Sequence, residues 1–237
     1  MLRVDTKTAQ THVHQVSTFL IPRMMDQNLM VRQAVVQLVM RLMQATSPVT
    51  VIGIMSDNVH HKSPRVRQMT VDLVTAALLT HPRCDFDLPA LCGIAVPALV
   101  DQKKAVRHAA MECVAAVAQA LGAGKLQPLM SAVDRVEEEP KYEGLMAAVQ
   151  ARLSRRQLPS VTDKGLVEYA TTVRGTVTGV DVDWIRSGLY SLDSPVRSES
   201  FEVKTSTASP SRHHVGMSAK SLHKLPWEKD AAEVCNV

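Results

Sequence analysis

Residues 21–34 read IPRMMDQNLMVRQA, and residues 96–109 read VPALVDQKKAVRHA. The two stretches share Pro, Asp, Gln, Val, Arg and Ala at equivalent positions. A third stretch, residues 60–68 (HHKSPRVRQ), keeps the Val-Arg pair but has His61 where the others have aspartate. Recurrence of this kind is typical of a repeat protein, in which each copy is one supersecondary unit that packs on its neighbours.

Each copy is predicted to be a pair of antiparallel helices. Apolar residues recur at spacings of three and four on both sides of each loop, as in Val31, Val35 and Leu38. Pro22 and Pro97 lie inside the predicted first helices, which they should bend, because proline lacks an N–H donor and its ring clashes with the preceding turn. The predicted first helices are residues 14–25, 48–59 and 88–100, the second helices begin near residues 31 and 66, and a fourth pair covers residues 126–136 and 142–153.

The order of Pro, Asp four residues later, and Val-Arg a further five and six residues on resembles the HEAT repeat family. The first and third copies match in full and the second in part. HEAT proteins stack helix pairs so that every unit packs on the next. We therefore expect an all-α fold, a HEAT-repeat α-solenoid of about four helix pairs, over residues 8–157.

Residues 158–237 differ in composition and are expected to form a mostly disordered tail. Residues 1–158 hold 18 Lys and Arg against 13 Asp and Glu, whereas residues 159–237 hold 9 against 10, together with 18 Ser or Thr. Such a segment buries too little apolar surface to offset its chain entropy, although a short helix is predicted near residues 164–170. Ser194 and Ser209 each begin a Ser-Pro-x-Arg sequence and are candidate phosphorylation sites.

Several classes of protein are excluded at this point. No run approaches the roughly 18 apolar residues of a membrane helix, and residues 1–12 do not resemble a signal peptide. The net charge of +4 is too small to predict nucleic-acid binding. The four cysteines lack the spacing of a disulfide frame or a metal site, and no cofactor is predicted. Residues 122–125 (GAGK) lack phosphate-loop spacing, and no nucleophile elbow is present, so we do not expect an enzyme.

A finer resemblance lies where the last helix pair ends. Residues 151–159 (ARLSRRQLP), followed by residues 165–170 (GLVEYA), look like the end of a TOG domain in the crescerin-type TOG-array proteins, regulators of axonemal microtubules related to the CLASP family. The short basic loops between paired helices are similar to TOG loops too. The resemblance implies a module that binds αβ-tubulin or microtubules in the cytoplasm and cytoskeleton, at the cilium axoneme or the centrosome.

The match to a TOG domain is partial. TOG domains usually contain six repeats, and an early loop typically supplies tubulin with an aromatic or large apolar anchor. This chain has about four helix pairs, which corresponds to the later part of such a domain. Its first tryptophan is Trp184. We therefore expect tubulin affinity to be reduced or lost.

The resemblance assigns tubulin binding to one edge of the solenoid, where equivalent loops line up. Because tubulin is acidic, cations on this edge should steer the encounter and donate hydrogen bonds to carboxylates. A plain solvated loop explains the same residues equally well. The candidate tubulin-binding residues are Gln27, Asn28, Lys62, Ser63, Arg65, Gln102, Lys103 and Lys104.

A second set of residues recurs with the repeats, and recurrence favours a structural role over ligand contact. An aspartate precedes the repeat arginine by six residues in the first and third copies, and Asp-to-Arg pairs would tie adjacent repeats or cap the second helix. The ladder should be interrupted at His61. Its predicted members are Asp26, Arg32, Arg67, Asp101 and Arg107.

One alternative function stays open on this sequence. A helical scaffold could bind a different protein, without tubulin, through its concave face or its apolar end. Such an adaptor would carry its best surface on the helices instead of the loops. The oligomeric state is not predicted.

Overall fold

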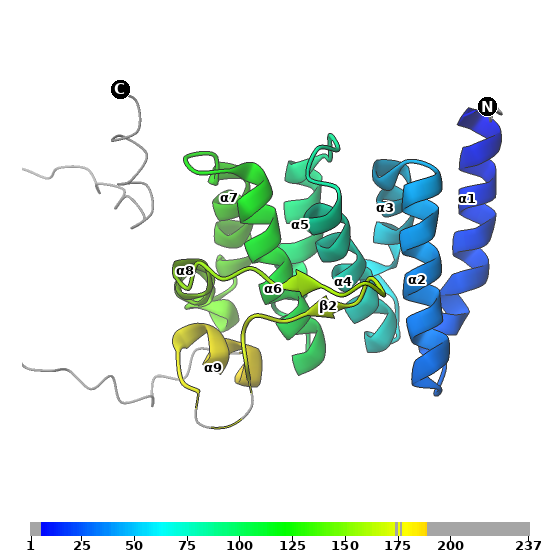
Figure 1. Cartoon of the computed structure of the whole chain (residues 1–237). Helices are drawn as coiled ribbons and strands as arrows, with labels where there is room; N and C mark the ends of the chain where they lie inside the picture. Colours follow the sequence, from blue (N-terminus) through cyan, green and yellow to red (C-terminus); the bar gives the residue numbers. More distant parts are fainter. Residues whose placement is uncertain (1–5, 174, 176, 189–237) are drawn as a thin grey trace, which may run out of the picture. The chain divides into compact units, whose positions relative to one another are not determined.

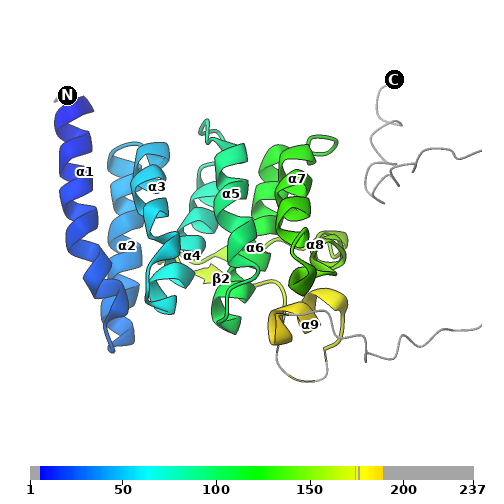
Figure 2. The same cartoon turned by 180° about the vertical axis from the view of Figure 1, so that it is seen from behind.

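The computed structural model describes residues 6–173, 175 and 177–188, all within one compact unit spanning Met1–Tyr190. In this unit, helices α1 to α7 stand in a row and alternate in direction (Figure 1, Figure 2). The arrangement confirms the all-α solenoid. The first helices of the four pairs are α1 (Thr6–Leu20), α3 (Pro48–Ser56), α5 (Leu88–Ala98) and α7 (Gln127–Glu137), and the second helices are α2 (Leu29–Ala45), α4 (Pro64–Thr80), α6 (Lys104–Leu121) and α8 (Leu145–Ser154).

Side-chain caps start helices such as α2 and α5, and a glycine ends α6. The Asn28 side chain accepts a hydrogen bond of 2.9 Å from the backbone N–H of Met30 at the start of α2. Asp87 caps α5 in the same way, through the N–H of Ala90 at 3.0 Å. Each bond satisfies an N–H that the helix itself cannot pair. Gly122 ends α6 with a φ of 82°, a conformation that glycine adopts without strain.

The prolines lie at helix ends, which differs from the bent first helices expected from the sequence. After Leu20 the chain tightens into the 3-10 helix η1 (Ile21–Met25), and Pro22 lies in its first turn, where its missing N–H leaves no bond unmade. Pro97 is the last residue but one of α5. Similar short 3-10 helices, η2 (Asp57–His60) and η3 (Pro140–Tyr142), follow α3 and α7.

The core is continuous from repeat to repeat, and α6 lies at its centre. Buried residues occur all round α6, where Val106, Met111 and Val117 are fully enclosed. A helix that is apolar on every side is covered on every side. On α6 this cover comes from α4, α5, α7, α8 and α9 (Val180–Ser187).

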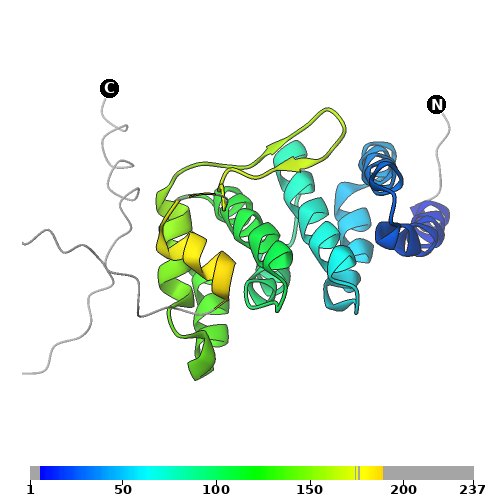
Figure 3. The same ribbon diagram turned by 90° about the horizontal axis from the view of Figure 1, so that it is seen from below.

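The chain beyond α8 is folded onto the repeats, which corrects the expected boundary between solenoid and tail near residue 158. Strands β1 (Ser160–Val161) and β2 (Val167–Glu168) pair as an antiparallel hairpin against α4, and helix α9 (Val180–Ser187) comes after it (Figure 3). The helix predicted near residues 164–170 is therefore wrong, because this stretch forms the turn and second strand of the hairpin. The segment has few apolar residues, but these pack against apolar surface of the helical repeats.

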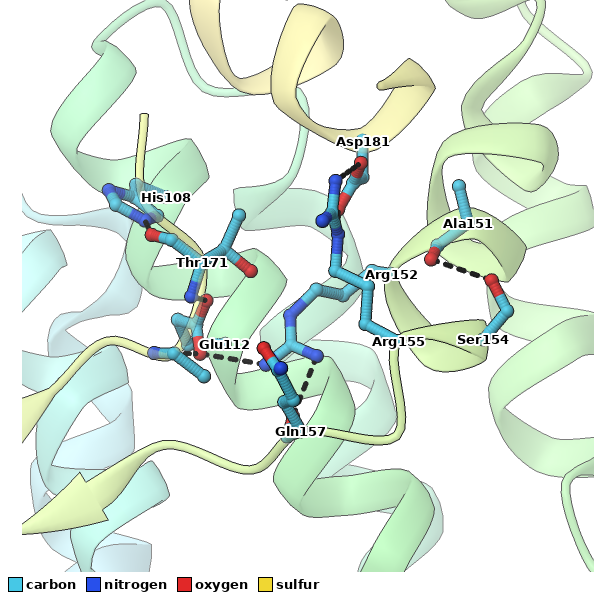
Figure 4. A network of polar contacts seen from close by, with 10 residues as sticks. His108, Glu112, Ala151, Arg152, Ser154, Arg155, Gln157, Thr171 and Asp181 are labelled. Atoms are coloured by element: carbon cyan, nitrogen blue, oxygen red, sulfur yellow. Dashed lines mark hydrogen bonds and ion pairs between the residues drawn. The ribbon is translucent and has the colours of Figure 1, made fainter. Parts of the chain in front are cut away.

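The fully buried carboxylate of Glu112 on α6 fixes the segment between the hairpin and α9. It accepts a 2.8 Å bond from Arg152 of α8 and bonds of 3.1 Å and 3.0 Å from the backbone N–H groups of Ala170 and Thr171 (Figure 4). Arg152 is equally buried, and it also donates to the carbonyl of Gln157 at 2.8 Å. Two repeats and the returning chain therefore share one desolvated ion pair.

Further polar bonds extend this attachment on both sides. The Tyr169 hydroxyl donates to Asp72 of α4 at 2.8 Å. The His108 ring nitrogen Nε2 lies 2.8 Å from the Thr171 carbonyl, so this nitrogen carries the proton. Burial lowers the pKa of His108, which is consistent with a neutral ring.

Helix α9 is held through its buried face and both of its ends. Trp184 is buried and its indole N–H donates to the Leu99 carbonyl at 3.0 Å. Arg155 of α8 binds Asp181 in the first turn with two bonds of 2.5 Å and 2.7 Å (Figure 4). At the other end, Arg107 donates to the carbonyls of Ile185 and Arg186. An acidic first turn and a cation at the last carbonyls also complement the helix dipole.

The described residues offer neither a membrane span nor a metal site. No described helix is both long and apolar enough to cross a membrane. The described part of the chain contains no group of three His, Cys, Asp or Glu residues that could hold a metal ion. Cys92 and Cys113 are buried free thiols, and burial raises the pKa of Cys92 to about 11 and that of Cys113 to about 12.

We expect Glu112→Gln to lower the free energy of unfolding by about 3 kcal/mol, because it leaves the Arg152 guanidinium buried without its counter-charge. The matched control is Glu139→Gln, which breaks an exposed pair with Lys141 and should change the free energy of unfolding much less, because water screens that pair. Urea unfolding followed by circular dichroism measures both. Equal losses in the two variants would contradict the central role of Glu112.

Gly188→Ala should destabilise the docking of α9 by about 1 kcal/mol or more. Gly188 has a φ of 74°, and an added Cβ would lie 3.1 Å from the Arg107 guanidinium. Gly53→Ala is the control, since Gly53 lies inside α3 with nothing within 4 Å of an added Cβ, and alanine should stabilise that helix. If the urea midpoints of both variants move in the same direction, the close approach of Gly188 to the Arg107 guanidinium does not matter for stability.

Candidate functional site

The loops inside the first three repeats lie at one edge of the row of helices. They comprise residues 26–28, 61–63 and 99–103, and they follow the first helices at the lower edge in Figure 1, which Figure 3 shows from below. The loops between repeats, such as residues 81–87 and 122–126, lie at the opposite edge. Residues that are distant in sequence are thus collected along one line.

The three repeat arginines fix these loops by one recurring interaction. In each repeat the arginine Nη1 donates to the two carbonyls that stand six and five residues before it. Two carbonyls at the end of each first helix are thereby paired. The bonds run from Arg32 to Asp26 and Gln27 at 2.6 Å and 3.0 Å, from Arg67 to His61 and Lys62 at 2.8 Å and 3.2 Å, and from Arg107 to Asp101 and Gln102 at 2.8 Å and 3.1 Å.

The residue six places before each repeat arginine closes the turn from the other side. Asp26 accepts from the backbone N–H of Asn28 at 2.7 Å, and Asp101 accepts from that of Lys103 at 2.8 Å. In the second repeat the ring nitrogen Nδ1 of His61 takes the same place and accepts from Ser63 at 3.0 Å. His61 therefore replaces aspartate in the turn but brings no carboxylate to it.

The other two guanidinium nitrogens, Nε and Nη2, have a different environment in each of the three arginines. Arg67 binds the carboxylate of Asp101 in the next repeat with two bonds, of 2.6 Å and 2.9 Å. Arg107 has no such loop beyond it and binds the end of α9 instead; burial lowers its pKa, against the effect of nearby Asp101. Nε and Nη2 of Arg32 have no partner among the described residues, and the aspartate that would serve them is replaced by His61. The Asp-to-Arg link is thus made once between adjacent loops.

The side chains of the candidate binding residues point away from this internal frame. Gln27, Lys62, Gln102, Lys103 and Lys104 are exposed, and none of the three lysines has an ion-pair partner within the described ranges. Their positive ends are available to an acidic surface.

The other three candidates also have roles within the fold. Asn28 caps α2, and Ser63 is half-buried at the start of α4. Arg65 makes two long bonds of 3.4 Å to the first loop, to the Met25 carbonyl and the Gln27 side chain. Arg65 therefore joins the first loop to the second, while its exposed position still lets it contact a ligand.

The basic character of the edge ends after the third loop. In the fourth repeat Glu137 accepts from the backbone N–H of Gly144 at 2.6 Å, and exposed Glu139 pairs with Lys141 at 2.6 Å. Helix α9 lies against α6 and α8 in this region. The basic strip, which consists of Lys62, Lys103 and Lys104, is consequently confined to the second and third loops and the start of α6.

Exposed apolar side chains lie beside the first loop. Leu29 is 56% exposed and Met30 is 66% exposed, both in the first turn of α2. Phe19, near the end of α1, is exposed under the guanidinium of Arg23, which lies 3.7 Å from its ring centre. Although tryptophan is absent from these loops, the edge does carry apolar groups that an interface could cover.

Sequence reasoning missed two parts of the site. The carbonyl-binding role of the repeat arginines cannot be read from side-chain patterns, because its acceptors are backbone atoms. The docked helix α9 does leave a signal, since Gly179 and Gly188 bracket an octamer with an acidic first turn and a basic last turn. Ser194 and Ser209, the candidate phosphorylation sites, lie outside the described residues.

Comparison with known proteins gives consistent results. No family model matches the chain. It is 37% identical over 220 residues to TOG array regulator of axonemal microtubules protein 1 of Mus musculus, and 33% identical over 162 residues to crescerin-like protein che-12 of Caenorhabditis elegans. These matches cover 86% and 68% of this chain, but the chain spans only 12% and 13% of the length of the two relatives.

A solved structure extends the likeness to three dimensions. It is described as "Crescerin uses a TOG domain array to regulate microtubules in the primary cilium", and it superposes with a TM-score of 0.60 at 39% identity. The match covers 70% of this chain and 72% of the other. Repeat sequence, helix order and this superposition agree that the chain belongs to the crescerin-type TOG-domain family.

Proposed function

We propose that this chain is a non-enzymatic module that binds αβ-tubulin or microtubules through the loops within its first three repeats. The observation that carries the proposal is that Lys62, Lys103 and Lys104 are exposed and have no acidic partner in the described part of the chain. They stand in, or directly after, loops that lie at one edge of the row of helices (Figure 3). Tubulin is acidic, so such a strip speeds the encounter and donates charge-assisted hydrogen bonds to carboxylates.

The relatives support the same partner. One is named as a regulator of axonemal microtubules, and the solved structure is described as regulating microtubules in the primary cilium. We extend both properties to this chain as part of the proposal, with the cytoskeleton of the cilium as its place of action. The fixed loops favour direct recognition, because the arginine bonds to the carbonyls order the loop backbone before a partner arrives.

The apolar groups beside the first loop supply the second element of the proposed interface. An edge of lysines alone would bind weakly and with little selectivity, since exposed ion pairs contribute little net energy. Met30 can add apolar burial at the end of the strip. In this proposal it replaces the aromatic anchor that the family resemblance led us to expect and that this chain lacks.

Reversing two lysines of the strip tests the proposal. Lys62→Glu with Lys103→Glu should weaken tubulin co-sedimentation roughly tenfold at low salt, and the difference from the unaltered chain should narrow as salt rises. Arg83→Glu with Lys125→Glu changes the net charge equally but lies in loops of the opposite edge. If both double variants lose the same affinity, only the overall charge matters and the loop edge is not the binding surface.

Met30→Ser should weaken tubulin binding severalfold with little effect on folding, because the side chain is largely exposed in the free protein. Leu38→Ser is the control, since Leu38 is also exposed on α2 but lies further from the loops. Co-sedimentation and urea unfolding measure the two effects separately. Equal affinities for the two variants would remove Met30 from the interface.

A further inference from the structure

A cavity of about 400 Å³ lies between α2, α4 and the β-hairpin, on the helical face next to the loop edge. Leu29 and Val36 line it from α2, Met69 from α4 and Leu166 from the hairpin. Its polar lining includes Arg32 and Arg65. The cavity thus combines an apolar wall with two guanidinium groups, and none of the candidate loop lysines contributes to it.

Arg32 enters this cavity with half of its guanidinium unused. Its Nη1 is bound to two loop carbonyls, but Nε and Nη2 have no partner among the described residues. The same pair of nitrogens on Arg67, one repeat later, binds the Asp101 carboxylate at 2.6 Å and 2.9 Å. The protein therefore contains its own example of the ligand that this arginine arrangement takes.

The unused half of Arg32 results from the identity of residue 61. His61 occupies the position that corresponds to Asp101, and its Nδ1 already accepts the N–H of Ser63. In the neutral ring the other nitrogen then carries the proton, so it is a donor and cannot accept from Arg32. Residue 61 therefore offers Arg32 no carboxylate.

The charge around the cavity favours an anion. Arg65 makes only two bonds, both 3.4 Å long, and so keeps its charge largely uncompensated. Asp72 is the acidic group of the lining, and its Oδ1 accepts from the Tyr169 hydroxyl. Burial raises the pKa of Asp72 to about 7, so its negative charge is reduced near neutral pH.

We propose that this cavity binds an acidic side chain of a protein partner, a glutamate or aspartate followed by a large apolar residue. Its carboxylate pairs with Nε and Nη2 of Arg32, as Asp101 pairs with Arg67, and the apolar residue packs against Leu29, Val36 and Leu166. The site is separate from the lysine strip. It does not require that tubulin be the partner.

The test is a titration of the full chain, labelled with ¹⁵N, with the peptide Gly-Ser-Gly-Glu-Leu-Gly-Ser-Gly. Amide and arginine side-chain signals should shift saturably around α2, α4 and the hairpin. The peptide with glutamine in place of glutamate should bind at least about tenfold more weakly, since it loses a charge-assisted bidentate pair. Equal affinity for the two peptides, or shifts confined to the loop lysines, would overturn the proposal.

His61→Asp is the decisive variant. It supplies the missing intramolecular carboxylate and retains an acceptor for the N–H of Ser63, as Asp26 and Asp101 do in their turns. It should raise the urea midpoint while weakening binding of the glutamate peptide at least about tenfold, so unfolding cannot explain the loss. Undiminished peptide binding by this variant would show that Arg32 is not the receptor.

Three further variants complete the test. Arg32→Lys keeps the positive charge but not the planar pair of donors, and it should also weaken peptide binding. Arg83→Gln removes a cation from the opposite edge and should leave peptide binding unchanged. Lys62→Glu with Lys103→Glu should bind the peptide within about threefold of the unaltered chain, since neither residue lines the cavity. The experiments therefore test the two proposals separately: tubulin binding by the loop lysines, and carboxylate binding by Arg32 in the cavity.

Discussion

The geometry of the loop edge depends on the bonds between three arginines and six backbone carbonyls. A first helix that ends at the edge leaves carbonyls unpaired, and the chain must turn within a few residues to begin the second helix. Arg32, Arg67 and Arg107 meet both needs, because a planar guanidinium donates to two adjacent carbonyls from inside the turn. The loop carbonyls are paired inside the turn, and the side chains of Gln27, Lys62, Gln102 and Lys103 are left exposed to solvent.

The second half of each guanidinium determines how the repeats are joined. Between the second and third repeats, Arg67 and Asp101 form a bidentate pair that is largely shielded from water. In the third repeat the corresponding nitrogens of Arg107 bind the carbonyl end of α9 instead of a carboxylate. Helix α9, fastened by Trp184 and Arg155, lies against α6 and α8 (Figure 1).

The repeats could be predicted from the sequence, whereas the segment of residues 160–188 could not. Val, Arg, Asp and Pro at repeated positions predicted the helix pairs, because each copy must bury the same face against the next, although the first helix begins at Thr6 and not near residue 14. The order found in residues 160–188 escaped prediction because it depends on partners far away in sequence. Glu112 accepts hydrogen bonds from the backbone N–H groups of Ala170 and Thr171, and no local pattern in residues 158–171 reveals a carboxylate buried in α6.

The candidate binding residues were also predictable only in part. Their position on one edge follows from the repeat alone and could be predicted. The contact of Arg65 with Met25 and Gln27 could not, because it depends on how two neighbouring loops pack. The cavity beside Arg32 was also out of reach, since one of its walls is the hairpin that composition had assigned to a disordered tail.

Residue 61 is the point at which the repeat departs from its own rule. Aspartate there would serve the turn as well as histidine does, as Asp26 and Asp101 demonstrate, and would in addition pair with Arg32. Stability therefore gives no reason for the histidine. Departures from local consistency in folded proteins tend to coincide with functional sites. This one leaves an arginine half-occupied in a cavity at the side of the exposed loop edge, next to the exposed apolar residues that begin α2, which is where a binding protein gains from an unpaired cation.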